Sequence, residues 1–537
     1  MGVADPSSSD VDVARLTTRR AGGLVRRVRV GSHVAVWLCV WVPALLVLGR
    51  GWTPLGDYAG IELQAYRSLS LHPPLVGMFS TAGLGIGHTV FDPGPLASWL
   101  LAIPVHVDPS HGLIWGSALL WGIALSVAIE AMWSAGHWPG CGLIALAVID
   151  LLWGAPSVLE NLAWNPYVPI PFLIASMALA FVVGEGDLGW WPALVVTGSI
   201  AAQTHLFYVL PAVGLVLVAP LVGLRAGGRP GRLRWLGAGL GVGLLCWVGP
   251  LIQSLGAHSN IAALARRTGG VPTLGYGFAF RLLGDSAGPF PVWLTHAPIG
   301  FYPDMGFTYD HSATYGAGAL FVIIAVTVLA AWTRNRGLFV CAAVTLVTTS
   351  AFLVSFAMIP TATLIVVDYL LVAVRVEGVL VWVLAMWCGV SLARTLVAAR
   401  TGYRPGGMNA ALGSAALIVL IAGGSSLGLA AAPEANAQFG TNWSTPEAGE
   451  VAGIVSVIEH TVPRGGVTVT LEGSLRDRLR IIAIGEGVGW RLVLDGWHPG
   501  LRGILPALSG LPPDPNAPDV AVRITESTAG VVESAER

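Results

Sequence analysis

The sequence predicts an all-α polytopic membrane bundle of about eleven transmembrane helices, followed by a small α/β domain. Of the 537 residues, 54% are hydrophobic and only 11% are charged, whereas soluble domains carry about 25% charged residues. Apolar runs long enough to cross a hydrocarbon core of about 30 Å recur along the chain. The alternating runs GVTVTLEG and WRLVLDG, which are typical of strands, lie in the polar segment 431–537.

Residues 1–32 are polar and rich in arginine, which predicts a disordered cytoplasmic N-terminus. The transmembrane domain follows over residues 33–430. No cleavage site follows its first apolar run, which is therefore expected to be an uncleaved span. The junction QTHLFY leaves almost no loop between two spans, so a reentrant or kinked pair stays open there. The predicted spans are 33–49, 112–133, 140–158, 168–184, 189–204, 207–224, 236–252, 316–333, 338–359, 376–394 and 409–430.

The distribution of arginine predicts the orientation of this bundle in a bacterial plasma membrane. Loops that stay in the cytoplasm carry an excess of basic residues. With a cytoplasmic N-terminus, two large loops, 50–111 and 253–315, and the C-terminal domain 431–537 lie outside the cell. The cytoplasmic arginines are then Arg15, Arg19, Arg20, Arg26, Arg27, Arg29, Arg225, Arg229, Arg232, Arg234, Arg334, Arg336, Arg394, Arg400 and Arg404.

The first outer loop carries two short helical patterns that suit the membrane interface rather than a span. One begins at Asp57, and the other covers 92–107. Asp57 is either a catalytic carboxylate or an ordinary helix N-cap, a position that aspartate favours. Glu62, on the same helix, is expected to be a solvated surface carboxylate if it has no catalytic or binding role.

Further polar residues are expected near the outer surface. LENLAWNPYVP (159–169) contains Asn165 and Tyr167, and QTHLFY (203–208) contains His205 and Tyr208. Each has a plain alternative: asparagine before proline forms turns, a histidine among apolar residues is often only a core residue, and Arg375 near the end of its span can snorkel. The five cysteines all lie in apolar runs and offer no disulfide framework.

Five short motifs, in order, resemble those of an actinobacterial family of integral membrane proteins related to GT-C glycosyltransferases. The motifs are GDYAGIEL, HPPLVGMFS, DPGPLASWLLAIP, NLAWNPYVPIPF and SIAAQTHLFYVLP. The resemblance implies a GT-C-like bundle, a polyprenyl-phosphate sugar donor and a catalytic carboxylate just after the first span, which is Asp57 here. The chain departs from the pattern where Asp92 replaces an expected histidine, and where Ser80 and Thr81 replace an expected Ser-Arg.

The predicted function is an inverting transfer of a sugar from a polyprenyl-phosphate donor to an extracytoplasmic glycan or lipid acceptor. Asp57 is the predicted base. An arginine is expected to stabilise the departing phosphate, with Arg375 first and then Arg266 and Arg267. The expected substrate-binding residues are Glu62, His72, Asp92, Asn165, Tyr167, His205 and Tyr208.

Two alternatives stay open: a transporter or flippase of a lipid-linked sugar, and a catalytically inactive scaffold. A transporter is typified by internal repeats and paired broken helices at mid-membrane, and no repeat is evident. The sequence indicates no cofactor, although a divalent cation stays open. The net charge of −1 offers no general attraction to nucleic acid. The expected partners are therefore the lipid bilayer, the donor and the acceptor.

Overall fold

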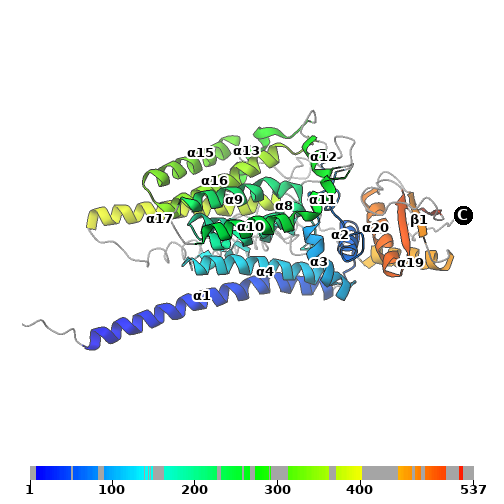
Figure 1. Cartoon of the computed structure of the whole chain (residues 1–537), viewed down its shortest axis with the longest axis horizontal. Helices are drawn as coiled ribbons and strands as arrows, with labels where there is room; N and C mark the ends of the chain where they lie inside the picture. The colour runs from blue at the N-terminus through cyan, green and yellow to red at the C-terminus, as the bar shows by residue number, and fades with distance from the viewer. Residues whose placement is uncertain are drawn as a thin grey trace, which may run out of the picture.

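Long helices packed side by side make up most of the computed structural model (Figure 1). The structure describes residues 8–49, 52–80, 82, 90–137, 140–142, 144–145, 147–148, 162–225, 231–256, 259–266, 272–288, 291, 312–361, 371–401, 445–461, 466–472, 478–502 and 519–523. The bundle contains α1 (Ser8–Gly49), α4 (Gly112–Ser134), α7 (Pro169–Gly184), η2 (Leu188–Trp190), α8 (Trp191–Thr204), α9 (Val209–Leu224), α10 (Arg232–Cys246), α13 (Gly275–Ala287), α15 (Ala313–Trp332), α16 (Arg336–Ala357) and α17 (Leu371–Thr401).

Five helices are long and apolar enough to cross a membrane, and a sixth span is added if α10 and the following α11 count as one. The chain is therefore a multi-pass integral membrane protein. The five are Arg26–Gly49, Gly112–Ser134, Leu206–Leu224, Ala313–Trp332 and Arg336–Ala357.

Several predicted spans need correction or stay untested. The span predicted at 236–252 is not straight, because α10 and α11 (Val248–Ser254) meet at a bend of 57°. Those predicted at 168–184 and 189–204 are the helices α7 and α8, which have only 16 and 14 residues. The span 409–430 and most of 140–158 lie outside the described residues. The total of about eleven spans thus stays a prediction.

The predicted disorder of residues 1–32 is also corrected, because α1 is helical from Ser8. Arginine and leucine have high helix propensity, and the segment lies directly before an apolar span. Once that span is helical, each further residue adds a hydrogen bond without the cost of a new nucleus. The helix can therefore extend backwards from the span.

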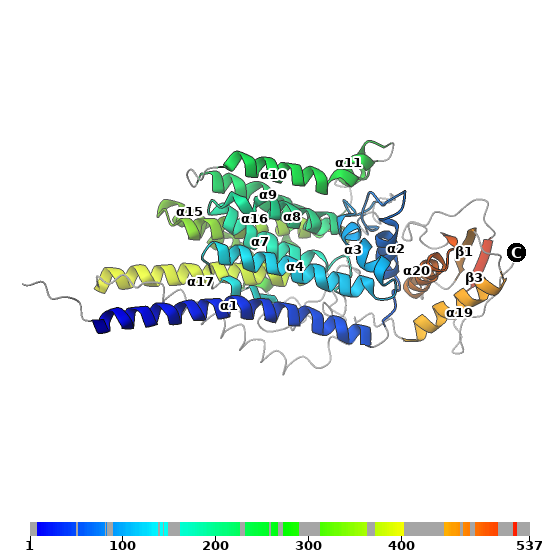
Figure 2. The same cartoon turned by 60° about the horizontal axis from the view of Figure 1, so that its bottom comes forward.

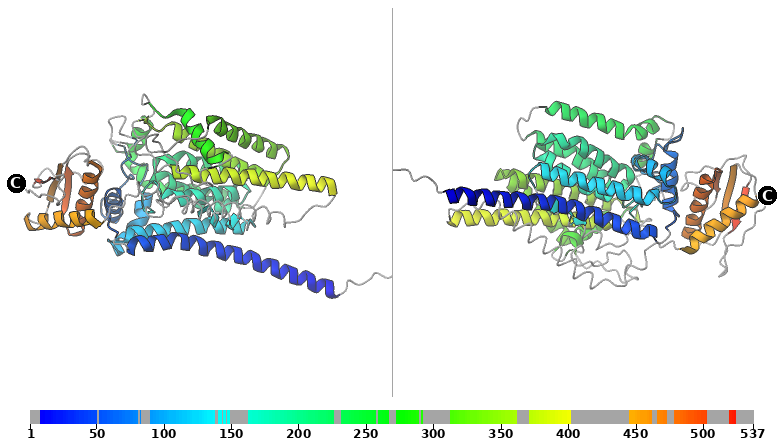
Figure 3. Two further views of the ribbon diagram at one scale, coloured as in Figure 1. Left: turned by 180° about the vertical axis from the view of Figure 1, so that it is seen from behind. Right: turned by 90° about the horizontal axis from the view of Figure 1, so that it is seen from below.

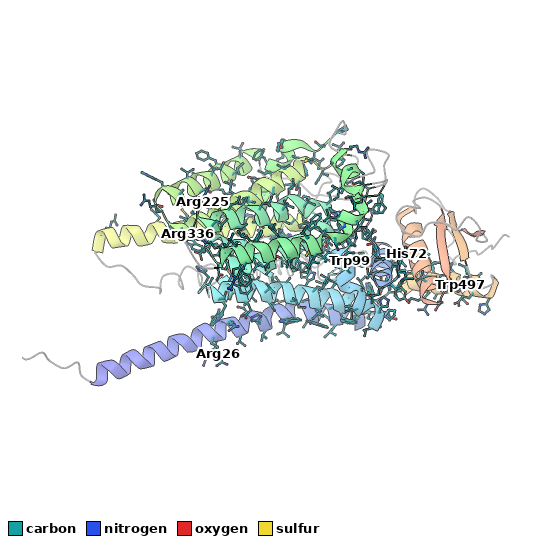
Figure 4. The ribbon with its side chains drawn as sticks, in the orientation of Figure 1. Arg26, His72, Trp99, Arg225, Arg336 and Trp497 are labelled. Carbon is teal, nitrogen blue, oxygen red and sulfur yellow. The ribbon has the colours of Figure 1, made fainter. Side chains whose placement is uncertain are left out.

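The two ends of the bundle differ. The N-terminal part of α1 and one end of α17 extend together beyond the other helices at one end of the bundle (Figure 2). At the opposite end, hereafter the α2 end, lie four short helices and the C-terminal segments (Figures 1 and 2). Arg26, Arg225 and Arg336 lie in the half of the molecule away from α2 (Figure 4). The four short helices are α2 (Asp57–Arg67), α3 (Leu96–Val107), α11 and α12 (Asn260–Arg266).

The described part of the C-terminal segment forms two helices and a parallel three-stranded sheet, hereafter the C-terminal unit (Figure 3). Its elements are α19 (Thr445–Thr461), β1 (Gly466–Glu472), α20 (Arg478–Leu494), β2 (His498–Arg502) and β3 (Asp519–Arg523). The strand order is β2-β1-β3, with Val467 opposite Pro499 and Val469 opposite Val520. Parallel neighbours require a crossover connection, which α20 supplies between β1 and β2. Whether one domain covers all of 431–537 stays a prediction.

Candidate active site

Asp57 is the first residue of α2, at the α2 end of the bundle. Gly56 before it is the N-cap residue and has a φ of +56°, a conformation that glycine adopts without a steric penalty. The side chain of Asp57 is exposed and accepts a hydrogen bond of 2.8 Å from the indole Nε1 of Trp164. The alternative role of Asp57 as an N-cap is therefore wrong, because Gly56 occupies that position.

Asp92 lies in the loop before α3 and joins three other segments. Its Oδ1 accepts a hydrogen bond of 2.9 Å from the backbone N–H of Leu206. Its Oδ2 accepts one of 3.2 Å from the side-chain amide of Asn165. Its backbone pairs with Met78 and with Gly77, at 2.7 and 3.0 Å. Because Asp92 is 1% exposed, it holds these segments together from inside the protein.

The charge of Asp57 acts on the carboxyl group of Asp92. Burial raises the pKa of Asp92 well above its ordinary value, and the nearby charge of Asp57 raises it further, against the hydrogen bonds from Leu206 and Asn165. Desolvation by the surrounding protein raises the pKa of Asp57, while the hydrogen bond from Trp164 opposes this shift. Two neighbouring carboxyls with different environments can titrate separately, so one can act as a base while the other stays neutral.

The turn between α8 and α9 contacts Asp92 through the backbone N–H of Leu206. His205 ends α8, and η3 (Leu206–Tyr208) follows it. The Nδ1 of His205 accepts the Phe207 N–H at 3.3 Å, and burial lowers the pKa of His205 to about 3. The ring is therefore neutral at physiological pH, and this hydrogen bond leaves the proton on Nε2.

Two predicted tyrosines lie behind the site. Tyr208 is 0% exposed, and its hydroxyl donates to the backbone oxygen of Pro166 at 3.0 Å. Tyr167 is buried, with its ring edge-on to Trp164 at 5.4 Å. Both stabilise the turn that carries Trp164 and Asn165. Their placement gives them a supporting role, and the expected contact with substrate stays a prediction.

Residues that sequence reasoning missed complete the scaffold. Trp164 holds Asp57, and Asn260 at the start of α12 exchanges hydrogen bonds of 2.9 and 3.0 Å with the backbone of Phe91. Gln64 joins α2 to the backbone oxygen of Gly77 at 3.1 Å and to the hydroxyl of Ser98 at 3.3 Å. Trp164 lies within a recognised motif, and Asn260 lies in the segment GPLIQSLGAHSNIAALAR, which continues the resemblance weakly. The sequence therefore marked the segments that contain Trp164 and Asn260, but it did not show that these residues hydrogen-bond to Asp57 and Phe91.

A glycine lets two of these segments approach closely. A Cβ atom on Gly94 would lie 2.2 Å from Oε1 of Gln203 and 2.7 Å from Cγ of Pro250. The N–H of Gly94 donates to the backbone oxygen of Gln203 at 3.2 Å. Only glycine fits this contact, which sets the distance between the loop of Asp92 and the end of α8.

Glu62 is the clearest correction among the predicted residues. It was expected to be solvated unless functional, yet it is 0% exposed. Neither of its carboxyl oxygens has a hydrogen-bond partner within the described ranges. Helix α2 packs against both α3 and α20. The side chains in the middle of α2 are therefore covered on all sides. Burial raises the pKa of Glu62 well above its ordinary value, and the charge of Asp108 adds to the shift.

Glu62 is expected to make stability fall as pH rises. Its folded pKa lies above the unfolded value, so the folded state binds more protons once the pH exceeds about 4.3. Stability is highest below that pH and is lost as the pH rises toward the folded pKa, by up to about 1.4 kcal/mol per pH unit. Glu62→Gln should remove this slope, as thermal unfolding in detergent at several pH values would measure. Glu459→Gln, at an exposed position of α19, is the matched control. An unchanged slope in Glu62→Gln would contradict the assignment.

Three further predicted residues lie at other places in the described structure. His72 is exposed and lies beyond the end of α2 opposite to Asp57. Arg375 is buried on α17, and Arg266 is exposed on α12, with its Nε on the backbone oxygen of Ala262. Arg267 lies outside the described residues. Among the residues described, no arginine forms an ion pair with Asp57 or Asp92, and no group of three metal-binding side chains occurs.

The site thus combines an accessible carboxylate, a buried carboxyl and a neutral imidazole at one end of a membrane bundle. Asp57 is exposed and has a raised pKa, which suits a group that accepts a proton. Asp92 holds its neighbours in place. His205 lies on the corner whose Leu206 N–H binds Asp92.

The solved structures that resemble this fold include three with low sequence identity. One is ArnT from Cupriavidus metallidurans in the apo state, with a TM-score of 0.48, 14% identity and 92% of each chain covered. The apo oligosaccharyltransferase of Archaeoglobus fulgidus has a TM-score of 0.29 and 14% identity, over 85% of this chain and 64% of that one. AglB from the same organism, solved with an inhibitory peptide and a dolichol-phosphate, has a TM-score of 0.30 and 13% identity, over 90% and 64%.

No protein-family model and no curated protein matches this chain. Membership in the actinobacterial family thus remains an expectation from the five motifs. The TM-scores of 0.48, 0.29 and 0.30 are too low to assign a fold or a function. The function is therefore inferred from the residues of the site.

Proposed function

We propose that this protein is a GT-C-type membrane glycosyltransferase that transfers a sugar from a polyprenyl-phosphate donor to an acceptor hydroxyl, with inversion. The observation that carries the proposal is the Asp57–Asp92 pair at the α2 end of a multi-pass bundle. One carboxyl is accessible and the other is buried, and their environments differ. The exposed carboxyl of Asp57 can accept a proton, while the buried carboxyl of Asp92 holds the surrounding segments through its hydrogen bonds to Asn165 and Leu206.

The proposed chemistry needs one base and no general acid. The acceptor oxygen attacks the anomeric carbon, and the bond from that carbon to the phosphate oxygen breaks. The acceptor proton passes to Asp57, and polyprenyl phosphate leaves with the electron pair of the broken bond. A phosphate is already a good leaving group, so no residue has to protonate it.

The donor suits the position of the site. A polyprenyl chain can lie in the hydrocarbon region while its phosphate and sugar reach the interface where α2 and α3 lie. A nucleotide sugar would need a phosphate-binding loop, and none is evident in the sequence. Arg375, Arg266 and Arg267 are the proposed partners of the donor phosphate.

The proposed orientation has the α2 end and the C-terminal unit outside the plasma membrane. Arg26, Arg225 and Arg336 lie in the opposite half (Figure 4), which supports a cytoplasmic location for that half. The acceptor is then a cell-envelope glycan or lipid.

A transporter of a lipid-linked sugar is the second candidate, and the bend of 57° between α10 and α11 favours it. Transporters use discontinuous helices of this kind to line a substrate site near the middle of the membrane. Here α11, the second helix of the bent pair, is linked to the loop of Asp92. Gln253 of α11 accepts the backbone N–H of Asn260 at 2.9 Å, and the side-chain amide of Asn260 donates to the backbone oxygen of Asp92.

The experiment that separates the two candidates uses the full chain in proteoliposomes. With a polyprenyl-phosphate sugar carrying a radiolabel, we expect label in a glycan or lipid acceptor and release of free polyprenyl phosphate. A nucleotide sugar without lipid carrier should give no product. Movement of intact donor across the bilayer without release of polyprenyl phosphate would instead identify the transporter.

A further inference from the structure

The C-terminal unit touches the segment that carries Asp57. Helix α20 packs against α2, and the contact at Gly487 is especially close. A Cβ atom at Gly487 would lie 2.6 Å from Cδ2 of Leu55, 3.1 Å from Cγ2 of Val451 on α19 and 3.6 Å from the backbone oxygen of Pro54. Leu55 is 1% exposed and precedes Asp57 by two residues. The missing side chain of Gly487 therefore allows α20 to reach the start of α2.

Aromatic rings make a second contact at the other end of α2. The ring of Trp490 on α20 lies edge-on to Tyr66 at 5.5 Å. On α3, His106 stacks on Tyr66 at 4.5 Å, with an interplanar angle of 1°. Trp490 is 3% exposed, so this is a packed interface. Helix α20 thus contacts both the start and the last turns of α2.

We propose that the C-terminal unit is a brace that holds α2, and through it Asp57, in position for the reaction. The inference rests on the proposed function for its catalytic consequence. Gly487 and Trp490 are then positioning residues, since they reach Asp57 only through Leu55 and Tyr66. Helix α2 has 11 residues, which is too short for a stable helix on its own in water. The orientation of its first residue therefore depends on the surfaces that pack against it.

Gly487→Ala tests the brace, because it should stabilise helix α20 and at the same time disturb the contact of α20 with α2. Alanine has a higher helix propensity than glycine, so the substitution should stabilise α20 itself. The new methyl group would nevertheless overlap Leu55 and push α20 away from the start of α2. The matched control is Gly449→Ala in α19, where nothing lies within 4 Å of the added Cβ atom.

Gly487→Ala is expected to lower kcat by about 10–100-fold, because misplacement of a catalytic group by about 1 Å can cost 100-fold. The KM for the lipid donor should stay within about twofold, since binding does not need the base. The backbone amides of 57–67 should exchange hydrogen faster. Gly449→Ala should leave turnover and exchange unchanged.

A second substitution provides rescue. Leu55→Val removes the Cδ atoms that lie closest to the new methyl group. The double variant Leu55→Val, Gly487→Ala should therefore turn over faster than Gly487→Ala alone. Wild-type kcat and wild-type exchange of 57–67 in Gly487→Ala would overturn the brace. If the wild-type protein transfers no sugar from any lipid donor, the proposed function fails, and the exchange of 57–67 alone then decides whether the brace exists.

Discussion

An Asp57→Asn protein is expected to fold and bind the lipid donor, yet to transfer sugar about 10²–10⁴-fold more slowly. Asparagine has the same shape as aspartate, and its Oδ1 can still accept the indole hydrogen bond from Trp164. It cannot accept the acceptor proton, because an amide is not a base in this pH range. Single-turnover transfer, with donor binding measured separately, isolates this step.

The pH profile gives an independent reading of the same residue. A base must be deprotonated, so kcat/KM should fall as pH drops through the pKa of Asp57. Since the protein raises that pKa, the acid limb should lie above the ordinary value of about 3.9. In Asp57→Asn, the remaining kcat/KM should be low and should no longer fall as the pH drops through this range. Near-normal turnover in Asp57→Asn would remove Asp57 from the chemistry and leave it as the structural start of α2.

Hydropathy and local pattern predicted much of the framework. The described helices α4, α9, α15 and α16 follow apolar runs that the sequence marks directly. The two short helices of the first loop, α2 and α3, were also predicted from local spacing. Such predictions succeed because the length and amphipathic pattern of a helix depend on neighbours within a few residues.

The surroundings of the site could not be predicted in this way. The partner of Asp57 is Trp164, which is 107 positions away, and Asn260 reaches the backbone of Asp92 across 168 positions. Glu62 lies on a helix that α20 covers, from the far end of the chain. The helical pattern that begins at Asp57 gives no information about which distant segment packs against that helix.

The corrections to the predicted site residues have the same origin. Asn165, His205 and Asp92 were placed near one another from motifs alone, and the structure brings their segments together. Tyr208 and Glu62 also lie in the recognised motifs, but Tyr208 points to the backbone of Pro166 and the carboxyl oxygens of Glu62 have no hydrogen-bond partner among the described residues. A motif marks the segment that builds a site, whereas the direction of each side chain depends on the packing of several segments.

Asp92→Ala is expected to destabilise the whole α2 end. It would leave two part-buried donors, the Leu206 N–H and the Asn165 amide, without their acceptor. A fully buried orphaned donor costs about 1–3 kcal/mol, so these two together cost at most about 6 kcal/mol, against a total stability of about 5–15 kcal/mol. Thermal unfolding in detergent should show a large drop in Tm, and hydrogen exchange should rise first in 203–208.

Asp92→Asn separates this scaffold role from catalysis. The new amide oxygen can accept from Leu206, and the amide of Asn165 can turn over to accept from the new NH₂ group, so both hydrogen bonds survive. The substitution also removes a buried ionisable group whose pKa burial has raised. We therefore expect a Tm close to wild type and turnover within about tenfold, well short of the loss of a general base. If Asp92→Asn is instead stable but inactive while Asp57→Asn transfers sugar normally, the two carboxylates have exchanged roles and Asp92 is the base.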